Sequence, residues 1–407
     1  MTIHAIVLLL GAMLLWSLIA ARMASAPVTG PMVMVFAGLV ISSGSAIDTT
    51  TGHAAAHLLA ELTLIIVLFS DAARINLRAL KKGNRQPLRM LVFGLPGAIA
   101  VGTLLGLWLY PDLGFWSIAM LAAILAPTDA ALGEAVVSSS AVPAVTRQTL
   151  SVESGLNDGL VVPIVLLFAC GANITHNLGV ASDWVLLAAR QIGFGTLTGI
   201  VVGYAGARVT RAALDAGTLG QSWQGISSLA LAGLAWAIAE MIHGNGFISA
   251  FIAGMVFGNT LQRPAAFLFE FSETEGQLLV LATFAVFGAV MLPEVWPQIN
   301  ATVLLYAITS LTIVRMLPIM LSLLGTATDW RDRLFLAWFG PRGLASILFI
   351  LLVGESGGIP HYELLTTIVF TTVALSVLLH GITAGPLASL YGKTASTAAT
   401  SEKPIEL

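Results

Sequence analysis

The sequence predicts an all-helical protein that crosses a membrane many times, and three observations predict it. Of the 407 residues, 57% are hydrophobic and only 10% are charged, whereas a soluble domain carries roughly 25% charged residues. Thirteen apolar stretches approach the ~20 residues that a bilayer requires. The loops between them alternate between basic and non-basic along the chain. Together these features predict about thirteen transmembrane helices.

The apolar stretches give the predicted spans in order. The first begins at His4, with no Lys or Arg before it and no small-residue cleavage site after it, so we expect it to be retained as a membrane helix. The eighth and ninth are separated only by a tight turn at 243–246. The full set is expected at about 4–22, 27–44, 54–73, 90–110, 114–137, 147–170, 184–207, 222–242, 245–261, 276–293, 299–324, 333–354 and 362–389.

The basic residues test this arrangement, because Lys and Arg in short loops mark the cytoplasmic side of a membrane protein. Fifteen of the 18 basic residues lie in alternate loops or in the tail, and the intervening loops have none. An outside N-terminus and a cytoplasmic C-terminus fit every loop, and we expect the bacterial inner membrane as the location. Only Arg190, Arg315 and Arg342 fall within spans.

Two spans are interrupted, the fifth at Pro127-Thr128-Asp129 and the twelfth at 340–343, which reads GPRG. They lie seven spans apart, so with the seventh span as a linker the others form two six-helix units of opposite orientation. Broken helices at matching positions of two halves are typical of a transporter's midplane site. We therefore expect a transmembrane domain over 1–392, with inverted repeats at about 1–171 and 222–392, a linker helix at about 184–207, and a short cytoplasmic tail at 393–407.

The polar groups near the first interruption predict a cation site. On a helix, Ser154 lies four residues before Asp158 and on the same face. Asp129 and the freed backbone carbonyl of Thr128 could complete an oxygen cage for a small hard cation. A carboxylate that holds either a proton or a cation is sufficient for antiport once it is exposed alternately to the two sides. A buried hydrogen-bonded network is the alternative interpretation of Asp158 and Asp129.

Other classes of function have less support. The single cysteine, Cys170, excludes a disulfide framework and a clustered-cysteine metal site, and no nucleic-acid patch is present. The sequence shows no nucleophile paired with a general base, so we do not expect an enzyme. We also expect no cofactor. A cation channel would need a filter shared between subunits or a backbone loop, and a symporter for organic anions would need basic groups at the site, which here is acidic.

The motifs TDAALG, ESGLNDG, GPRGLAS and GFISAFIAGMVFGN together resemble the monovalent cation:proton antiporters of the bacterial NhaP and eukaryotic NHE type, over nearly the whole membrane domain. The resemblance implies inverted six-helix repeats with two broken, crossing helices, a mobile core and a dimerisation domain, and hence a homodimer in the lipid bilayer. It implies exchange of Na⁺ for H⁺, with Li⁺ and K⁺ as alternatives.

The resemblance also implies roles for single residues. Asp158 would be the essential carboxylate that carries the cation or the proton, with Asp129, Thr128 and Ser154 as further ligands or supports. Asn157 stands where electrogenic relatives have a second aspartate, which suits one-for-one electroneutral exchange.

A buried ion pair between the sixth and eleventh spans is implied by the same resemblance, since Glu153 and Arg315 match the family's acidic and basic partners. Without a counter-ion an arginine inside a span would be prohibitive, so we expect this pair to be structural.

Two further charged residues remain open. Arg342 could neutralise the negative ends of the broken helices, or bind Glu134 or Asp129. Asp71 could lie near the ion path, as in some family members, although pairing within its own helix to Arg74 or Arg78 is favoured.

Overall fold

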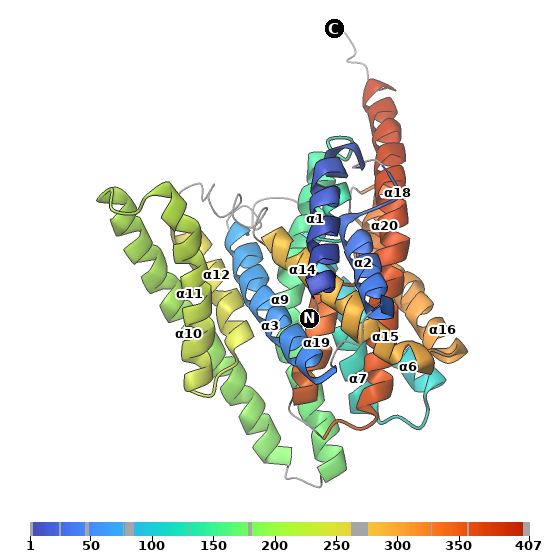
Figure 1. Ribbon diagram of the computed structural model, residues 1–407, viewed down its shortest axis with the longest axis horizontal. Coiled ribbons are helices and arrows are strands. Elements are labelled where there is room, and N and C mark those ends of the chain that lie inside the picture. Colours follow the sequence, from blue (N-terminus) through green and yellow to red (C-terminus); the bar gives the residue numbers. More distant parts are fainter. Residues whose placement is uncertain are drawn as a thin grey trace.

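The computed structural model describes residues 3–23, 26–44, 49–75, 77, 85–129, 131–177, 181–261, 276–326, 328–355 and 358–401, and every regular element in them is helical. Eight of the helical segments are long and apolar enough to cross a membrane, and four shorter helices are equally apolar. The chain is therefore an integral membrane protein (Figure 1). The short tail predicted at 393–407 lies partly outside the described residues, which end at 401.

Each predicted span coincides with a helix or with a run of helices. Eight spans are single helices, and six of these are α1 (Ile3–Met23), α2 (Gly30–Gly44), α3 (Thr49–Arg74), α10 (Ala181–Asp215), α11 (Gln221–Met241) and α12 (Gly246–Leu261). The sixth and thirteenth spans are α9 (Ala144–Asn177) and α20 (Tyr362–Ser401). Both of these helices, and α10, are longer than predicted. The length of an apolar stretch reflects the thickness of the bilayer, and a helix can continue beyond it.

Three spans contain a π-helical turn, which the sequence analysis did not predict. The fourth consists of α5 (Gln86–Arg89), η1 (Met90–Gly94) and α6 (Leu95–Leu109). The tenth consists of α14 (Gln277–Val286), η3 (Phe287–Met291), α15 (Leu292–Val295) and the short η4 (Trp296–Gln298). The eleventh consists of α16 (Ala301–Thr309), η5 (Ser310–Val314) and α17 (Arg315–Ser322).

A proline explains each π turn. Pro96, Pro293 and Pro318 each lie four residues after a residue of η1, η3 and η5. A proline ring clashes with the carbonyl four residues earlier and offers it no N–H, and the wider π turn accommodates this while the span continues. The helices therefore bulge where the sequence analysis expected straight spans.

The fifth and twelfth spans are broken, as predicted. In the fifth, α7 (Phe115–Ile124) is followed by turns and irregular backbone and then the short α8 (Glu134–Val137). In the twelfth, α18 (Trp330–Trp338) and α19 (Leu344–Glu355) are separated by residues 339–343. The N–H of Asp129 donates to the carbonyl of Pro341 at 2.8 Å, so the two breaks lie against each other.

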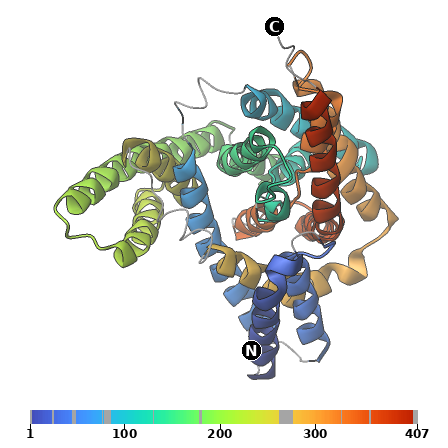
Figure 2. The same ribbon diagram turned by 90° about the horizontal axis from the view of Figure 1, so that it is seen from above.

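The helices around the breaks form a bundle from which other helices project. Figure 2 shows α10, α11 and α12 on one side and α1 and α2 on another, with α3 running between them. Glycine makes the α3–α12 contact unusually close: a Cβ on Gly254 would lie 2.1 Å from the carbonyl oxygen of Phe69, and one on Gly258 2.0 Å from that of Ala73. Small residues spaced four apart bring membrane helices together in this way.

Candidate ion-binding site

Asp129 joins the two broken spans through backbone groups. Its Oδ2 accepts the N–H of Leu344, the first residue of α19, at 2.7 Å. Its Oδ1 accepts the N–H groups of Ala131 at 2.8 Å and Leu132 at 3.3 Å. A carboxylate at a helix N-terminus satisfies free amides and opposes the positive end of the helix dipole. Backbone amides thus bind both carboxylate oxygens of Asp129. The residue also lines the cavity described below.

Gly343 makes this contact possible. A Cβ at this position would lie 2.0 Å from Oδ2 of Asp129. The GPRG interruption therefore needs glycine at its last position, so that the carboxylate can reach the start of α19.

Thr128, the residue before Asp129, is bound by α9 through its side chain and its carbonyl. The hydroxyl of Ser154 donates to the Thr128 carbonyl at 2.6 Å, and the amide of Asn157 donates to the Thr128 hydroxyl at 2.7 Å. That hydroxyl donates in turn towards Oε2 of Glu153 at 3.4 Å. Because Ser154 gives its hydrogen to Thr128, its oxygen lone pairs are left to accept.

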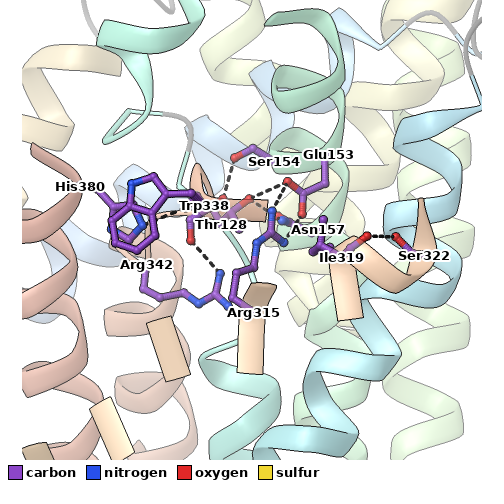
Figure 3. Close-up of polar contacts among 11 residues, drawn as sticks. Thr128, Glu153, Ser154, Asn157, Arg315, Ile319, Ser322, Trp338, Arg342 and His380 are labelled. Carbon is purple, nitrogen blue, oxygen red and sulfur yellow. Dashed lines mark hydrogen bonds and ion pairs between the residues drawn. The ribbon is translucent and has the colours of Figure 1, made fainter. Parts of the chain in front are cut away.

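Glu153 and Arg315 form a two-bond ion pair between α9 and α17 (Figure 3). Nη1 of Arg315 lies 2.6 Å from Oε1 of Glu153, and Nη2 lies 2.9 Å from Oε2. Both side chains are only 2% exposed. Geometry of this kind is needed to offset the loss of water around two buried charges.

Asp158 lies one turn after Ser154 on α9, and its Oδ1 is unsatisfied. The residue is 7% exposed, and this oxygen is buried without a hydrogen-bond partner among the described residues. Asp129, Asp71 and Glu153 are close enough to add negative charge around it. A buried acceptor without a donor is costly, so Oδ1 is suited to binding a proton or a cation. Oδ1 of the neighbouring Asn157 is unpartnered in the same way.

A small cavity lies beside the site, on the side of α8. Its walls combine polar groups of the first break with apolar side chains of α8, α9 and the second break: Thr128, Asp129, Gly133, Val136, Val137, Leu150, Ser154, Phe339 and Pro341. Ser154, one helical turn before Asp158, is among the residues that line it, so the cavity borders the polar residues of the crossing.

Asp71 of α3 lies near both of the neighbours expected for it, the ion path beside α9 and Arg74 in its own helix. Its Cβ lies 3.5 Å from the position a Cβ on Gly155 would occupy, so this part of α3 packs directly on α9. Arg74 is its strongest charged neighbour, and Asp129 also acts on it. Within the described part of the chain, no three His, Cys, Asp or Glu side chains gather as a metal cluster. A cation here would need hydroxyl and carbonyl oxygens as well as carboxylates.

Arg342 lies fully buried in the second break, and its hydrogen bonds are with backbone and hydroxyl groups. Its Nη1 donates to the carbonyl of Gly340 at 3.0 Å, and its backbone N–H donates to the hydroxyl of Ser376 at 2.6 Å. Nε and Nη2 have no partner among the described residues. Contact with a carbonyl just after α18 supports neutralisation of a negative helix end, one of the two alternatives from the sequence.

The other alternative for Arg342, binding Glu134 or Asp129, has less support. Oε2 of Glu134 accepts from the amide of Gln277 at 2.5 Å, and the Asp129 oxygens accept from backbone amides.

The sequence analysis did not identify two buried residues of α20, Ser376 and His380. They contact the second break: the hydroxyl of Ser376 accepts the Arg342 N–H, and His380 Nε2 lies 3.1 Å from the carbonyl of Trp338. Figure 3 shows His380 beside Trp338. The available signal was a serine and a histidine spaced four apart in the otherwise apolar thirteenth span, which places them on one helix face.

Comparison with known proteins places this geometry among related sequences and structures. A sequence model described as "Sodium/hydrogen exchanger, transmembrane" matches residues 7–390. The K(+)/H(+) antiporter NhaP2 of Shewanella sp. (strain ANA-3) is 25% identical over 358 residues, covering 86% of this chain and 61% of that protein. The K(+)/H(+) antiporter NhaP of Alkalimonas amylolytica is 24% identical over 396 residues, covering 95% and 67%.

A solved structure has the same fold. The sodium proton antiporter MjNhaP1 from Methanocaldococcus jannaschii at pH 8 superimposes with a TM-score of 0.76 at 19% identity, covering 94% of this chain and 99% of that one. The predicted fold class, an all-helical antiporter fold with two broken crossing helices, is confirmed by this match. In sequence, the chain spans about three-fifths of the length of the Shewanella relatives.

Proposed function

Because the chain belongs to the sodium/hydrogen exchanger family, we propose that it exchanges a monovalent cation for a proton across a membrane and that both ions bind Asp158 in turn. The observation that carries this proposal is the unsatisfied Oδ1 of Asp158, buried beside the crossing of two broken spans. A proton or a cation would satisfy that oxygen, but the two cannot occupy it together. Competition for one carboxylate couples the opposite movements of the two ions.

The cation would be held by oxygen atoms from α9 and the first break. Ser154 Oγ has free lone pairs, because its hydrogen points to the Thr128 carbonyl, and it lines the cavity. That carbonyl and the carboxylate of Asp129 border the same cavity, and Asp158 provides the charge. Asn157 contributes an unpartnered oxygen and holds Thr128 in place. Hard oxygen ligands of this kind suit an alkali cation.

We assign Asp71 an accessory role as part of the negative field around Asp158, with Arg74 partly neutralising it. Arg342 does not act as a ligand, since a cation repels it; it stabilises the second break. The Glu153–Arg315 pair is structural, since two bonds hold the buried side chains together.

Access alternates between the two sides of the membrane. With the N-terminus outside and the C-terminus in the cytoplasm, α8 and the start of α9 lie on the cytoplasmic side, so the cavity approaches the site from the cytoplasm. Movement of the bundle against the helices that project from it would expose the site to the other side. A homodimer in the bacterial inner membrane is the assembly and location that this proposal includes.

The contacts support one-for-one exchange without net charge movement. Glu153 is occupied by Arg315, Asp129 by three amides, and Asn157 carries no charge. With Asp71 in one charge state, Asp158 is then the carboxylate of the crossing that binds the cation and the proton in turn. Each passage carries either a cation or a proton.

Na⁺ is the proposed cation, with Li⁺ as an alternative. K⁺ is a second candidate, favoured by the names of the Shewanella and Alkalimonas relatives, which are K(+)/H(+) antiporters. The family consists of transporters, and the proposed activity is transport without enzymatic chemistry or a cofactor. A channel and an organic-anion symporter are less well supported, since the site is acidic and lies between two breaks.

Purified protein in liposomes tests the proposal. An acidic interior is established, and Na⁺, K⁺ or Li⁺ is added in turn while a pH-sensitive dye reports proton release. We expect cation-dependent release from the unmodified protein and none from Asp158→Asn. Release without any added cation, or equal release by the variant, would contradict antiport at Asp158. The order of the three apparent KM values identifies the preferred cation.

A further inference from the structure

His380 occupies a closed hydrogen-bonded ring behind the second break. It is 1% exposed, its Nε2 lies 3.1 Å from the carbonyl of Trp338, and its Nδ1 lies 3.2 Å from the hydroxyl of Ser376. That hydroxyl accepts the N–H of Arg342 at 2.6 Å. The ring therefore connects the two ends of the break, Trp338 and Arg342, through one unbroken helix, α20.

We infer that His380 is a positioning residue whose neutral form holds the second break in place, and that a proton on its imidazole slows the exchange cycle. This inference rests on the proposed function. It assigns a second proton-binding group, distinct from Asp158 and outside the path of the cation.

The direction of each hydrogen bond determines why the neutral form is needed. The Trp338 carbonyl can only accept, so Nε2 of neutral His380 carries the hydrogen. Nδ1 is then an acceptor and takes the hydroxyl hydrogen of Ser376, while the oxygen of Ser376 accepts from Arg342. Every group in the ring both has a partner and orients the next one.

A second proton opens this ring. Nδ1 becomes a donor, and the carbonyl of Ser376, 3.1 Å away, can accept from it. The hydroxyl of Ser376 then loses the acceptor for its hydrogen. Since a carbonyl faces each ring nitrogen, the site can accommodate the proton, but the bond that aligned Ser376 with Arg342 is lost.

Charge around His380 adds to this effect. The charged groups that act on it are Arg342, in the break, and Arg315, on α17. Arg315 is paired with Glu153, whereas Nε and Nη2 of Arg342 have no partner among the described residues. A proton on His380 adds a third positive charge to this cluster, and Arg342 is the arginine whose charge is not paired with a carboxylate there.

The indole of Trp338 keeps the imidazole in place. The two rings are stacked with centroids 5.0 Å apart and an angle of 28° between them, and the indole N–H donates to the hydroxyl of Thr383 at 3.1 Å (Figure 3). The imidazole is thus held in one orientation in which both nitrogens remain bonded. A change of pH therefore alters only whether the imidazole of His380 carries one proton or two.

Two proton effects on transport can be separated. Protons that compete at Asp158 raise the apparent KM for the cation, and a high cation concentration overcomes them. A proton on His380 acts away from the cation, so it lowers the maximal rate at any cation concentration. The maximal rate at saturating cation should therefore fall on the acidic side, by about tenfold for each pH unit below the midpoint of His380.

His380→Gln is the diagnostic variant. A glutamine amide donates to the Trp338 carbonyl and accepts from Ser376, as the neutral ring does, but does not titrate. In liposomes, its maximal rate at saturating cation should stay within about twofold between pH 8 and pH 4, a range extended to acid because burial and the two arginines oppose a second proton on His380. His4→Gln, at an exposed position of α1, is the matched control and should keep the acidic fall of the unmodified protein. An equal acidic fall in His380→Gln would overturn the inference.

Melting of the detergent-purified protein between pH 4 and pH 8 gives a readout that needs no transport. The difference in melting temperature between the unmodified protein and His380→Gln should change with pH, and a constant difference would overturn the inference even if antiport were demonstrated. Absence of cation-dependent proton release by the unmodified protein would instead contradict the proposed function.

Ser376→Ala provides the test if His380→Gln does not fold. Removal of the hydroxyl should lower the maximal rate at pH 8 several-fold and shift the acidic midpoint in both rate and melting, since Nδ1 loses its partner. Unchanged rates and an unchanged midpoint would overturn the inference.

Discussion

Asp129 and Leu344 lie 215 residues apart and meet at 2.7 Å, where the carboxylate of one broken span caps the first amide of the other. The same carboxylate borders the cavity that leads to Ser154. The crossing of the two breaks is therefore held together by a charge that also faces the proposed cation path.

Replacing Asp129 with Asn should reduce stability more than cation affinity. The amide can still accept from Leu344, but it loses the charge that opposes the helix dipole, and we expect a loss of about 1–2 kcal/mol. Thermal melting in detergent measures this loss, and transport at several cation concentrations gives the apparent KM. A KM raised far more than tenfold with unchanged melting would show that Asp129 acts chiefly as a ligand.

Asp158→Asn should abolish exchange and leave the protein folded. The amide preserves the shape of the side chain but can neither carry a proton nor balance a cation. Asp112→Asn, at an exposed loop position, serves as the control and should transport normally. Both variants should elute from a sizing column like the unmodified protein. Transport by Asp158→Asn at the normal rate would exclude the proposed mechanism.

Ser154→Ala should weaken cation binding with a smaller loss of maximal rate. Its hydroxyl is one neutral ligand, which a water molecule can replace. Ser43→Ala removes a comparable helix hydroxyl that donates to the Val40 carbonyl at 2.9 Å, and it should have no effect on transport. An apparent KM equal to that of the unmodified protein would count against Ser154 as a ligand.

Removing either partner of the Glu153–Arg315 pair should destabilise the protein by roughly 3–5 kcal/mol, because the other charge remains buried and unpaired. The double variant Glu153→Gln/Arg315→Gln should lose less than the sum of the single losses. A double-mutant cycle on melting in detergent measures the coupling. Additive losses would be inconsistent with the two-bond geometry between α9 and α17.

Exchange should be insensitive to the membrane potential. If the cation and the proton bind only Asp158, a transport cycle moves no net charge. Proton release driven by a pH gradient should then have the same rate whether or not valinomycin and K⁺ clamp the membrane potential. Na⁺ serves as the transported cation in this assay. Uptake driven by an imposed potential alone would disprove one-for-one exchange even if antiport were demonstrated.

Much of the fold could be predicted because membranes constrain sequence strongly. Apolar length and loop charge located the spans, and the prolines and glycines at 127 and 340–343 located the breaks. The family resemblance implied the pairing of Arg315 with Glu153, in agreement with the need of a buried arginine for a counter-ion, and the two side chains are in contact.

The rest depended on long-range backbone contacts, which leave little trace in a single sequence. The bonds from Asp129 to backbone amides could not be predicted, since any amide can bind a carboxylate and the partner at Leu344 is distant in the chain. The support of the second break by His380 was missed for the same reason: its partner is the carbonyl of Trp338, a group that every residue carries.

The π turn η5 immediately precedes Arg315, and it determines the direction in which that side chain points. A single-residue deletion within 310–314 that restored a regular α-helical turn would rotate everything after it by about 100° about the helix axis. The guanidinium of Arg315 would then leave Glu153 and face another helix or lipid. Insertions and deletions in this short stretch should therefore be tolerated far less well than substitutions, since they alter the azimuth of a buried charge without changing the composition of the span.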